Sequence, residues 1–158
     1  MSTLLTALQT AVWGHTLSEA ELRAAAAETT VKVIAPGGYA CRKGAPVDAW
    51  IGVLEGLVKM SSISPEGKPI TFTGVPAGGW FGEGSLLKYP EQRLYDVVAV
   101  RESRVAYLPR SAFNRLLDTN IAFNRFLLQQ INERLSQFIA VIENDRLLEP
   151  DEIGRAHV

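Results

Sequence analysis

The sequence is poor in the residues that build most catalytic and metal centres. It has one cysteine, Cys41, and two histidines, His15 and His157, which lie near opposite ends of the chain. A single cysteine excludes an internal disulfide, a cysteine-built zinc site and a four-thiolate iron–sulfur cluster. Two such histidines supply neither a Ser-His-Asp triad nor the several ligands of a cupin-like metal site. We therefore predict no catalytic residue, no metal site and no enzymatic activity.

The sequence also lacks a strong net charge and a long apolar run. Its 16 Lys and Arg residues nearly balance 17 Asp and Glu residues, so no overall field attracts nucleic acid or an anionic membrane. The N-terminal stretch MSTLLTALQTAVWGH has no basic region, and it has no apolar run near the roughly 18 residues that a membrane span needs. We expect no membrane partner and a cytoplasmic location.

The chain is long enough for one hydrophobic core, with helices at both ends. Ser18 and Glu21 form a Ser-x-x-Glu capping box, which predicts a helix from about Glu19 to Glu28. After Thr30, short β-rich runs alternate with Gly and Pro turns, a pattern typical of a sandwich, a barrel or a roll. The predicted strands are Val31–Ile34, Trp50–Leu54, Leu57–Ile63, Ile70–Val75, Val97–Val100 and Val105–Leu108.

A long helix is predicted from Ile121 to about Leu148, where the pattern is helical without an internal Pro or Gly. At about 1.5 Å per residue it would reach roughly 40 Å. Apolar residues recur at alternating spacings of three and four, which is the a/d spacing of a coiled coil. They are Leu128, Ile131, Leu135, Phe138 and Ile142. This spacing predicts a homodimer interface, and the alternative is the buried face of a C-terminal helix in a monomer.

The stretch GWFGEGSLLKYPEQRLYDVVA carries an isolated acid, Glu83, and an isolated base, Arg93. Its first part reads as a strand running into a one-turn helix, and glycines at 82 and 84 let an anion approach the backbone. An arginine can hold a phosphate bidentately, and a carboxylate can accept a hydrogen bond from a sugar hydroxyl. The combination predicts a site for a phosphorylated sugar, and the alternative is a solvated surface ion pair.

Several segments together resemble the N-terminal domain of the Crp/Fnr superfamily of bacterial transcription regulators. They are the hairpin AWIGVLEGLVKMSS, the segment WFGEGSLL followed by QRLYDVVAV, the closing RVAYLPRSAFNRLL and the long helix. The resemblance implies a mainly β fold with flanking helices, namely a double-stranded β-helix (a jelly-roll-like β-roll), followed by a dimerisation helix. It also implies that Glu83 binds the ribose 2′-hydroxyl and Arg93 the cyclic phosphate, with donors from Gly82 and Ser85.

The chain departs from the cAMP-binding pattern at three positions. Leu94 and Tyr95 follow the arginine, where the family has a small hydroxyl or amide residue and then Ala, and Gly84 replaces an apolar residue. The ligand prediction therefore stays open between cAMP, another nucleotide, another small anion and a vestigial site. The predicted ligand-binding residues are Gly82, Glu83, Gly84, Ser85, Arg93 and Leu94. Haem ligation by Cys41 and His15, as in another member of the superfamily, is a further alternative.

The predicted organisation has four parts. They are an N-terminal helical segment (1–30), a cyclic-nucleotide-binding-like β-roll (31–119), a dimerisation helix (120–149) and a tail (150–158). Members of the superfamily continue into a winged helix-turn-helix domain, which we expect to be absent from this chain. The resemblance thus implies the effector-sensing and dimerising part of a transcription regulator, with DNA bound only through the absent domain. The alternative is a stand-alone cyclic-nucleotide-binding module that regulates a partner protein.

Overall fold

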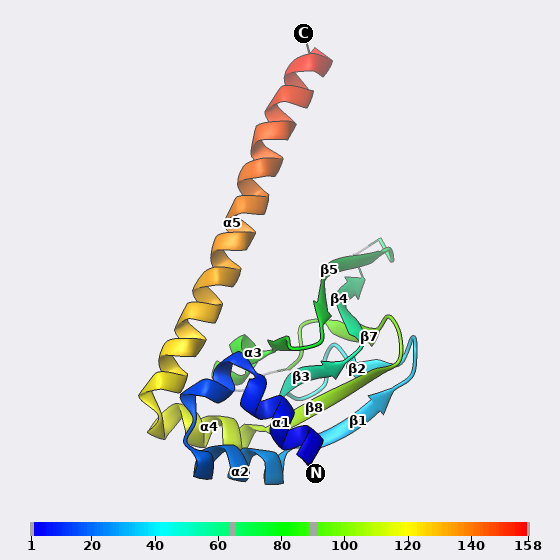
Figure 1. Ribbon diagram of the computed structural model, residues 1–158. Coiled ribbons are helices and arrows are strands. Elements are labelled where there is room, and N and C mark those ends of the chain that lie inside the picture. Colours follow the sequence, from blue (N-terminus) through cyan, green and yellow to red (C-terminus); the bar gives the residue numbers. More distant parts are fainter. Residues whose placement is uncertain (1, 64–65, 89–91, 158) are drawn as a thin grey trace. The chain divides into compact units, whose positions relative to one another are not determined.

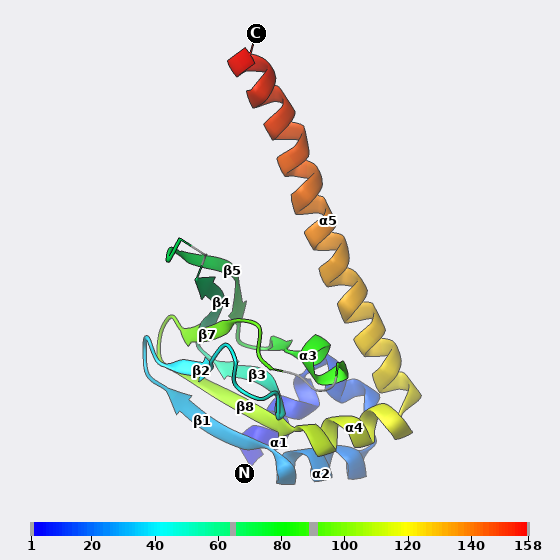
Figure 2. The same ribbon diagram turned by 180° about the vertical axis from the view of Figure 1, so that it is seen from behind.

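The structure is a computed structural model that describes residues 2–63, 66–88 and 92–157. Its strands form two antiparallel four-stranded sheets, with the orders β1-β8-β3-β6 and β2-β7-β4-β5 (Figure 1). The strands are β1 (Thr30–Ile34), β2 (Tyr39–Cys41), β3 (Ala49–Glu55), β4 (Leu57–Ile63), β5 (Pro69–Pro76), β6 (Trp80–Phe81), β7 (Asp96–Ala99) and β8 (Ser103–Pro109). Seen from behind, β1 and β8 run side by side beneath the second sheet (Figure 2). The predicted β-roll is confirmed.

The roll is held together by apolar side chains that face one another between the two sheets. Ile51, Val53 and Val105 come from the first sheet, and Val58 and Val97 come from the second. All five are at most 1% exposed. Side chains alternate between the two faces of a strand, so the residues between these positions face the other way. The first sheet therefore has a second face that must also be covered.

An aromatic cluster covers that second face of the first sheet. The cluster consists of Trp13, Trp50, Trp80, Phe113 and Phe123, with neighbouring ring centroids 5.0 to 6.1 Å apart. Gly52 lies directly beneath Trp80, and a Cβ atom on Gly52 would come within 2.2 Å of the indole ring. Only glycine fits there without a shift of the ring. Trp50 and Trp80 thus pack against each other in this cluster.

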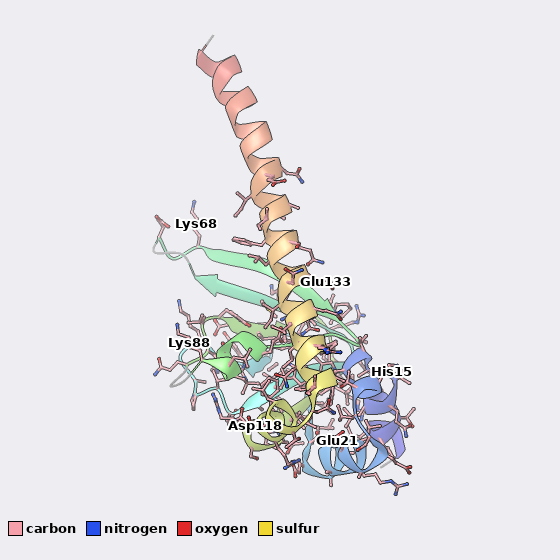
Figure 3. All side chains as sticks on the ribbon, turned by 90° about the vertical axis from the view of Figure 1, so that its left-hand side faces the viewer. His15, Glu21, Lys68, Lys88, Asp118 and Glu133 are labelled. Carbon is pink, nitrogen blue, oxygen red and sulfur yellow. The ribbon has the colours of Figure 1, made fainter. Side chains whose placement is uncertain are left out.

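Short helices also cover this face, and two of them supply cluster residues. The helices are α1 (Ser2–Thr10), the 3-10 helix η1 (Val12–Thr16), α2 (Glu19–Glu28) and α4 (Arg110–Thr119), with Trp13 from η1 and Phe113 from α4. Figure 3 shows them gathered at one end of the roll, with His15, Glu21 and Asp118 labelled. Helix α2 has the predicted bounds, and its capping box is confirmed because Glu21 N donates to Ser18 Oγ and Ser18 N donates to Glu21 Oε1. The sequence analysis predicted a helical segment over residues 1–30 but gave no bounds for α1 or η1.

The long helix α5 (Ile121–His157) begins where predicted. Asn120 caps it, since its Oδ1 accepts from Phe123 N at 2.8 Å while its Nδ2 donates to Thr16 O at 2.9 Å. The helix continues beyond the predicted end at Leu148 and through the expected tail. Pro150 removes one backbone donor, but it does not stop the following residues from forming their own helical bonds.

The chain divides into two compact units, Met1–Phe123 and Asn124–Val158. The first unit contains both sheets, the aromatic cluster and the first turn of α5. The second contains the rest of α5. Within the described residues, no helix combines the length and apolar character needed to cross a membrane.

Candidate functional site

The predicted ligand-binding stretch starts at the turn between β6 and the short helix α3 (Glu83–Leu87). Gly82 forms this turn with a φ of 92°, a left-handed conformation that favours glycine. The turn is also crowded, since a Cβ atom on Gly82 would lie 2.6 Å from Nη1 of Arg93. The structure therefore brings Gly82 and Arg93 together across eleven positions of sequence.

Glu83 points into the protein and is 1% exposed. Its Oε1 atom accepts a hydrogen bond from Nε1 of Trp50 at 3.1 Å. A carboxylate needs such donors when it is buried, because an ionised group without partners is strongly unfavourable in the interior. The sequence analysis did not predict this bond, which no local motif signals.

Arg93 is also buried, at 3% exposed, and several bonds fix its position. Its Nη2 donates to Ala49 O at 2.6 Å. Its backbone pairs with the loop before β3, because Arg93 N donates to Ala45 O at 2.8 Å and Gly44 N donates to Arg93 O at 2.7 Å. Nη1 is buried without a hydrogen-bond partner in the described part of the chain. The guanidinium therefore keeps a donor available beside Gly82.

The other predicted ligand residues lie in different surroundings. Leu94 is 63% exposed, and Gly84 is exposed with open space around the position of an added Cβ atom. Ser85 is half-buried in α3. Tyr95 is also half-buried and packs against the apolar core of the roll. The structure thus gathers Gly82, Glu83 and Arg93 inside the protein and leaves Gly84 and Leu94 on its surface.

A cavity of about 480 Å³ has Arg93 in its wall. It contains none of the other predicted ligand residues, and its wall includes Ala40, Cys41, Asp48, Ile51, Arg93 and Tyr107. Burial raises the pKa of the Cys41 thiol and raises the pKa of Tyr107 to about 12, so both groups stay protonated at neutral pH. The Tyr107 hydroxyl donates to Ala40 O at 2.6 Å and fastens β8 to β2.

The described residues contain no group of three His, Cys, Asp or Glu that could hold a metal ion. The buried cation beside the Gly82 turn is Arg93, whose Nη1 atom would lie 2.6 Å from a Cβ atom on Gly82. The chemistry that this arrangement offers is hydrogen bonding: Glu83 accepts and Arg93 donates.

The predicted dimer interface lies on α5, and its five apolar residues are all exposed on the chain. Their exposed fractions range from 36% for Ile131 to 68% for Leu128, with Leu135, Phe138 and Ile142 between them. Polar side chains such as Glu133 occupy other positions on the same helix (Figure 3). We refer to the five apolar residues as the seam.

Comparison with known proteins identifies the fold and the family. The sequence profile of the cyclic nucleotide-binding domain matches residues 31–120. The transcriptional regulator SdrP of Thermus thermophilus is 32% identical over 98 residues, which make up 62% of this chain and 44% of that protein. The chain thus spans less than half the length of this curated relative.

Two solved structures share the fold over most of the chain. The sensor domain of the transcriptional regulator DNR from Pseudomonas aeruginosa superposes with a TM-score of 0.76 at 24% identity, covering 85% of this chain and 90% of that one. The regulatory domain of Toxoplasma gondii PKA with cAMP has a TM-score of 0.71 at 26% identity, covering 84% of this chain and 49% of that one. The resemblance to the N-terminal domain of Crp/Fnr regulators is confirmed, and the chain belongs to the family of cyclic nucleotide-binding domains.

Proposed function

We propose that this chain is the effector-sensing and dimerising part of a Crp/Fnr-type transcription regulator, and that its effector is a cyclic nucleotide or a related small phosphate. The observation that carries this proposal is the buried Nη1 atom of Arg93, which lacks a partner in the described residues and lies against Gly82. A buried donor without a partner costs about 1–3 kcal/mol. A phosphate oxygen would supply the missing acceptor.

The proposed site assigns a role to each predicted residue. Arg93 binds the phosphate, and Gly82, which has no Cβ atom, leaves the space that the Arg93 guanidinium occupies beside the turn. Glu83 accepts from a ribose hydroxyl, as the resemblance implies. Ser85 contributes a hydroxyl from α3, while Gly84 and Leu94 form the outer edge of the site. None of these proposed contacts requires catalysis, and the proposed role is that of a sensor. The proposed location is the cytoplasm.

Homodimerisation through the seam is the second part of the proposal. Five apolar residues at coiled-coil spacing are exposed on one helix, and a second copy of the same helix would cover them. In the complete regulator, the effector would change the balance between two arrangements of the dimer by its differential affinity for them. DNA would bind through a winged helix-turn-helix domain that lies outside this chain.

A stand-alone module that regulates a partner protein is the alternative function. The likeness to the regulatory domain of a protein kinase favours it, because that domain is shown with cAMP and shares the fold. A helix-turn-helix coding sequence in frame with this chain would support the regulator, and the coding sequence of another domain type would support the module.

Thermal unfolding with a set of added compounds tests the ligand. The set contains cAMP, cGMP, the non-cyclic nucleotide AMP and inorganic phosphate. A ligand that binds the folded state raises Tm by mass action, and we expect this rise for a cyclic nucleotide. If none of these compounds raises Tm, the proposed ligand class is contradicted.

Calorimetric titration of Arg93→Ala tests the residue. We expect the affinity for the stabilising nucleotide to fall about 10- to 100-fold, which corresponds to the loss of a charged hydrogen-bond partner. Arg101→Ala is the matched control, because Arg101 is exposed and its Nη2 makes only a 3.5 Å contact with Gly56 O. Circular dichroism checks that Arg93→Ala still folds without its bond to Ala49. Unchanged affinity in the folded variant would remove Arg93 from the site.

A further inference from the structure

We infer that Trp50 is a positioning residue for Glu83 and that it couples the effector site to the first turn of α5 through the aromatic cluster. This inference rests on the proposed function, since it takes Glu83 as the ligand's hydroxyl acceptor. Two contacts of the same buried ring carry it. The Trp50 N–H donates to Glu83 Oε1 at 3.1 Å, and the centroid of the Trp50 ring lies 5.7 Å from that of Phe123.

The bond between Trp50 and Glu83 is favourable because both side chains are almost completely buried. Trp50 is 0% exposed and Glu83 is 1% exposed. The low dielectric constant of the interior strengthens a hydrogen bond between two buried side chains. Because the indole ring is rigid and packed on several sides, the N–H holds the carboxylate in one orientation.

Trp13 provides an internal comparison within the same cluster. Its ring centroid lies 5.0 Å from that of Trp50, and its side chain is 1% exposed. Its Nε1 atom, however, is buried without a hydrogen-bond partner among the described residues. Packing in the cluster therefore does not by itself require a partner for the indole N–H. Trp50 therefore differs from Trp13 in that its indole N–H donates to Glu83.

The contacts of Trp50 also reach the point where α5 begins. Its ring contacts Phe113 at 5.4 Å and Phe123 at 5.7 Å, and Phe123 lies in the first turn of α5. Phe123 N in turn donates to Oδ1 of the capping residue Asn120 at 2.8 Å. A closely packed interior transmits small shifts because its side chains have few alternative positions. A shift of the Trp50 ring is thus felt at the start of the helix.

A ribose hydroxyl that donates to Glu83 would share or take the acceptor that Trp50 now uses. Either outcome changes the hydrogen bond of the indole N–H and the position of its ring. Trp50 therefore has two roles: it orients Glu83 before the ligand arrives, and it reports the ligand's hydroxyl to Phe123. The first role depends on the N–H group, and the second depends on the N–H group together with the packing of the ring against Phe123.

Binding measurements with two ligands test the positioning role. We compare cAMP with 2′-deoxy-cAMP, which lacks the hydroxyl that Glu83 would accept, in the wild type and in Trp50→Phe. Phenylalanine keeps an aromatic ring but has no N–H group. We expect the preference for the ribose form to fall about 5- to 10-fold in Trp50→Phe and to stay unchanged in Trp13→Phe. An unchanged preference in folded Trp50→Phe, or an equal loss in Trp13→Phe, would overturn the inference.

A measurement without ligand separates this inference from the proposed function. The three tryptophans give three indole N–H signals in a ¹H–¹⁵N correlation spectrum, which Trp50→Phe and Trp13→Phe assign. We expect Glu83→Gln and Phe123→Leu each to move the Trp50 signal, while the exposed Glu133→Gln leaves it in place. If Glu83→Gln leaves that signal unmoved, the coupling is wrong even where cAMP binds. If cAMP fails to bind but the signal moves, the proposed ligand fails and the contact network stands.

Discussion

The aromatic cluster and the seam of α5 are built from large apolar residues that meet opposite surroundings. Every member of the cluster is at most 5% exposed, whereas every member of the seam is at least 36% exposed. The cluster draws its residues from η1, β3, β6, α4 and the first turn of α5, so its members cover one another within one chain. The seam has its spacing, but its residues stay exposed in the part of the chain that the structure describes. Apolar periodicity thus specifies a surface, and only tertiary contacts decide what covers it.

The largest expected difference between the two regions comes from removing one aromatic ring from each of them. Phe113→Ala should lower the free energy of unfolding by about 3–5 kcal/mol, because Phe113 is fully buried between Trp50 and Phe123. Phe138→Ala should change the free energy of protomer unfolding by only about 0.5 kcal/mol, because Phe138 is 63% exposed. Urea unfolding measured at low protein concentration provides both values.

The same pair of variants separates the two regions by their oligomeric state. Sedimentation velocity should show weaker dimerisation for Phe138→Ala, whereas folded Phe113→Ala should dimerise like the wild type. If Phe138→Ala lowers the stability of the protomer as much as Phe113→Ala does, the seam is covered within the chain and the homodimer proposal fails.

Adding a methyl group gives the second effect, which should be smaller. Gly52→Ala places a Cβ atom within 2.2 Å of Trp80 in the cluster, and such overpacking costs typically about 1–3 kcal/mol. Gly84→Ala is the matched control, since its Cβ atom would meet open space on helix α3. There we expect a gain of roughly 0.5–1 kcal/mol from reduced backbone freedom in the unfolded chain. Thermal unfolding measures both, and equal behaviour of the two variants would contradict the packing of Trp80 on Gly52.

The smallest effect concerns a polar group that is partly buried inside the roll. The pKa of Tyr107 is raised to about 12 from an ordinary value of 10.0, mainly by burial. The unfolded chain therefore loses this proton first as the pH rises. The stabilising contribution is complete below about pH 10 and is lost as the pH approaches about 12. Tyr107→Phe should flatten the fall of stability across this window, and an equally steep fall in the variant would contradict the shift.

Much of the fold could be predicted because its signals are local. The capping box of Ser18 and Glu21 marks the start of α2, and the β-rich runs separated by glycine turns locate six of the eight strands. β2 was missed because it is only three residues long and follows Gly37 and Gly38 without a clear alternation. Helix α1 lies within the predicted helical segment 1–30, but its bounds were not predicted because it carries no capping motif that the sequence analysis recognised.

The candidate site was only partly predictable, because its contacts join residues that are far apart in the sequence. Glu83 and Arg93 could be selected from chemistry and resemblance, but their actual partners lie far away in the sequence. Trp50 is 33 positions from Glu83, and Ala49 is 44 positions from Arg93. The cavity beside Arg93 is likewise formed by segments from α2 to β8, so no single stretch encodes it.

The three tryptophans of the cluster have an optical consequence. The ring centroids of Trp13, Trp50 and Trp80 lie 5.0 Å apart in every pair. The electronic transitions of indoles at this separation and in fixed, non-parallel orientations are coupled. The folded chain should therefore give a near-ultraviolet circular dichroism band that no isolated tryptophan produces. That band is a label-free gauge of the cluster, and its sign and size follow any rotation of one ring against the other two.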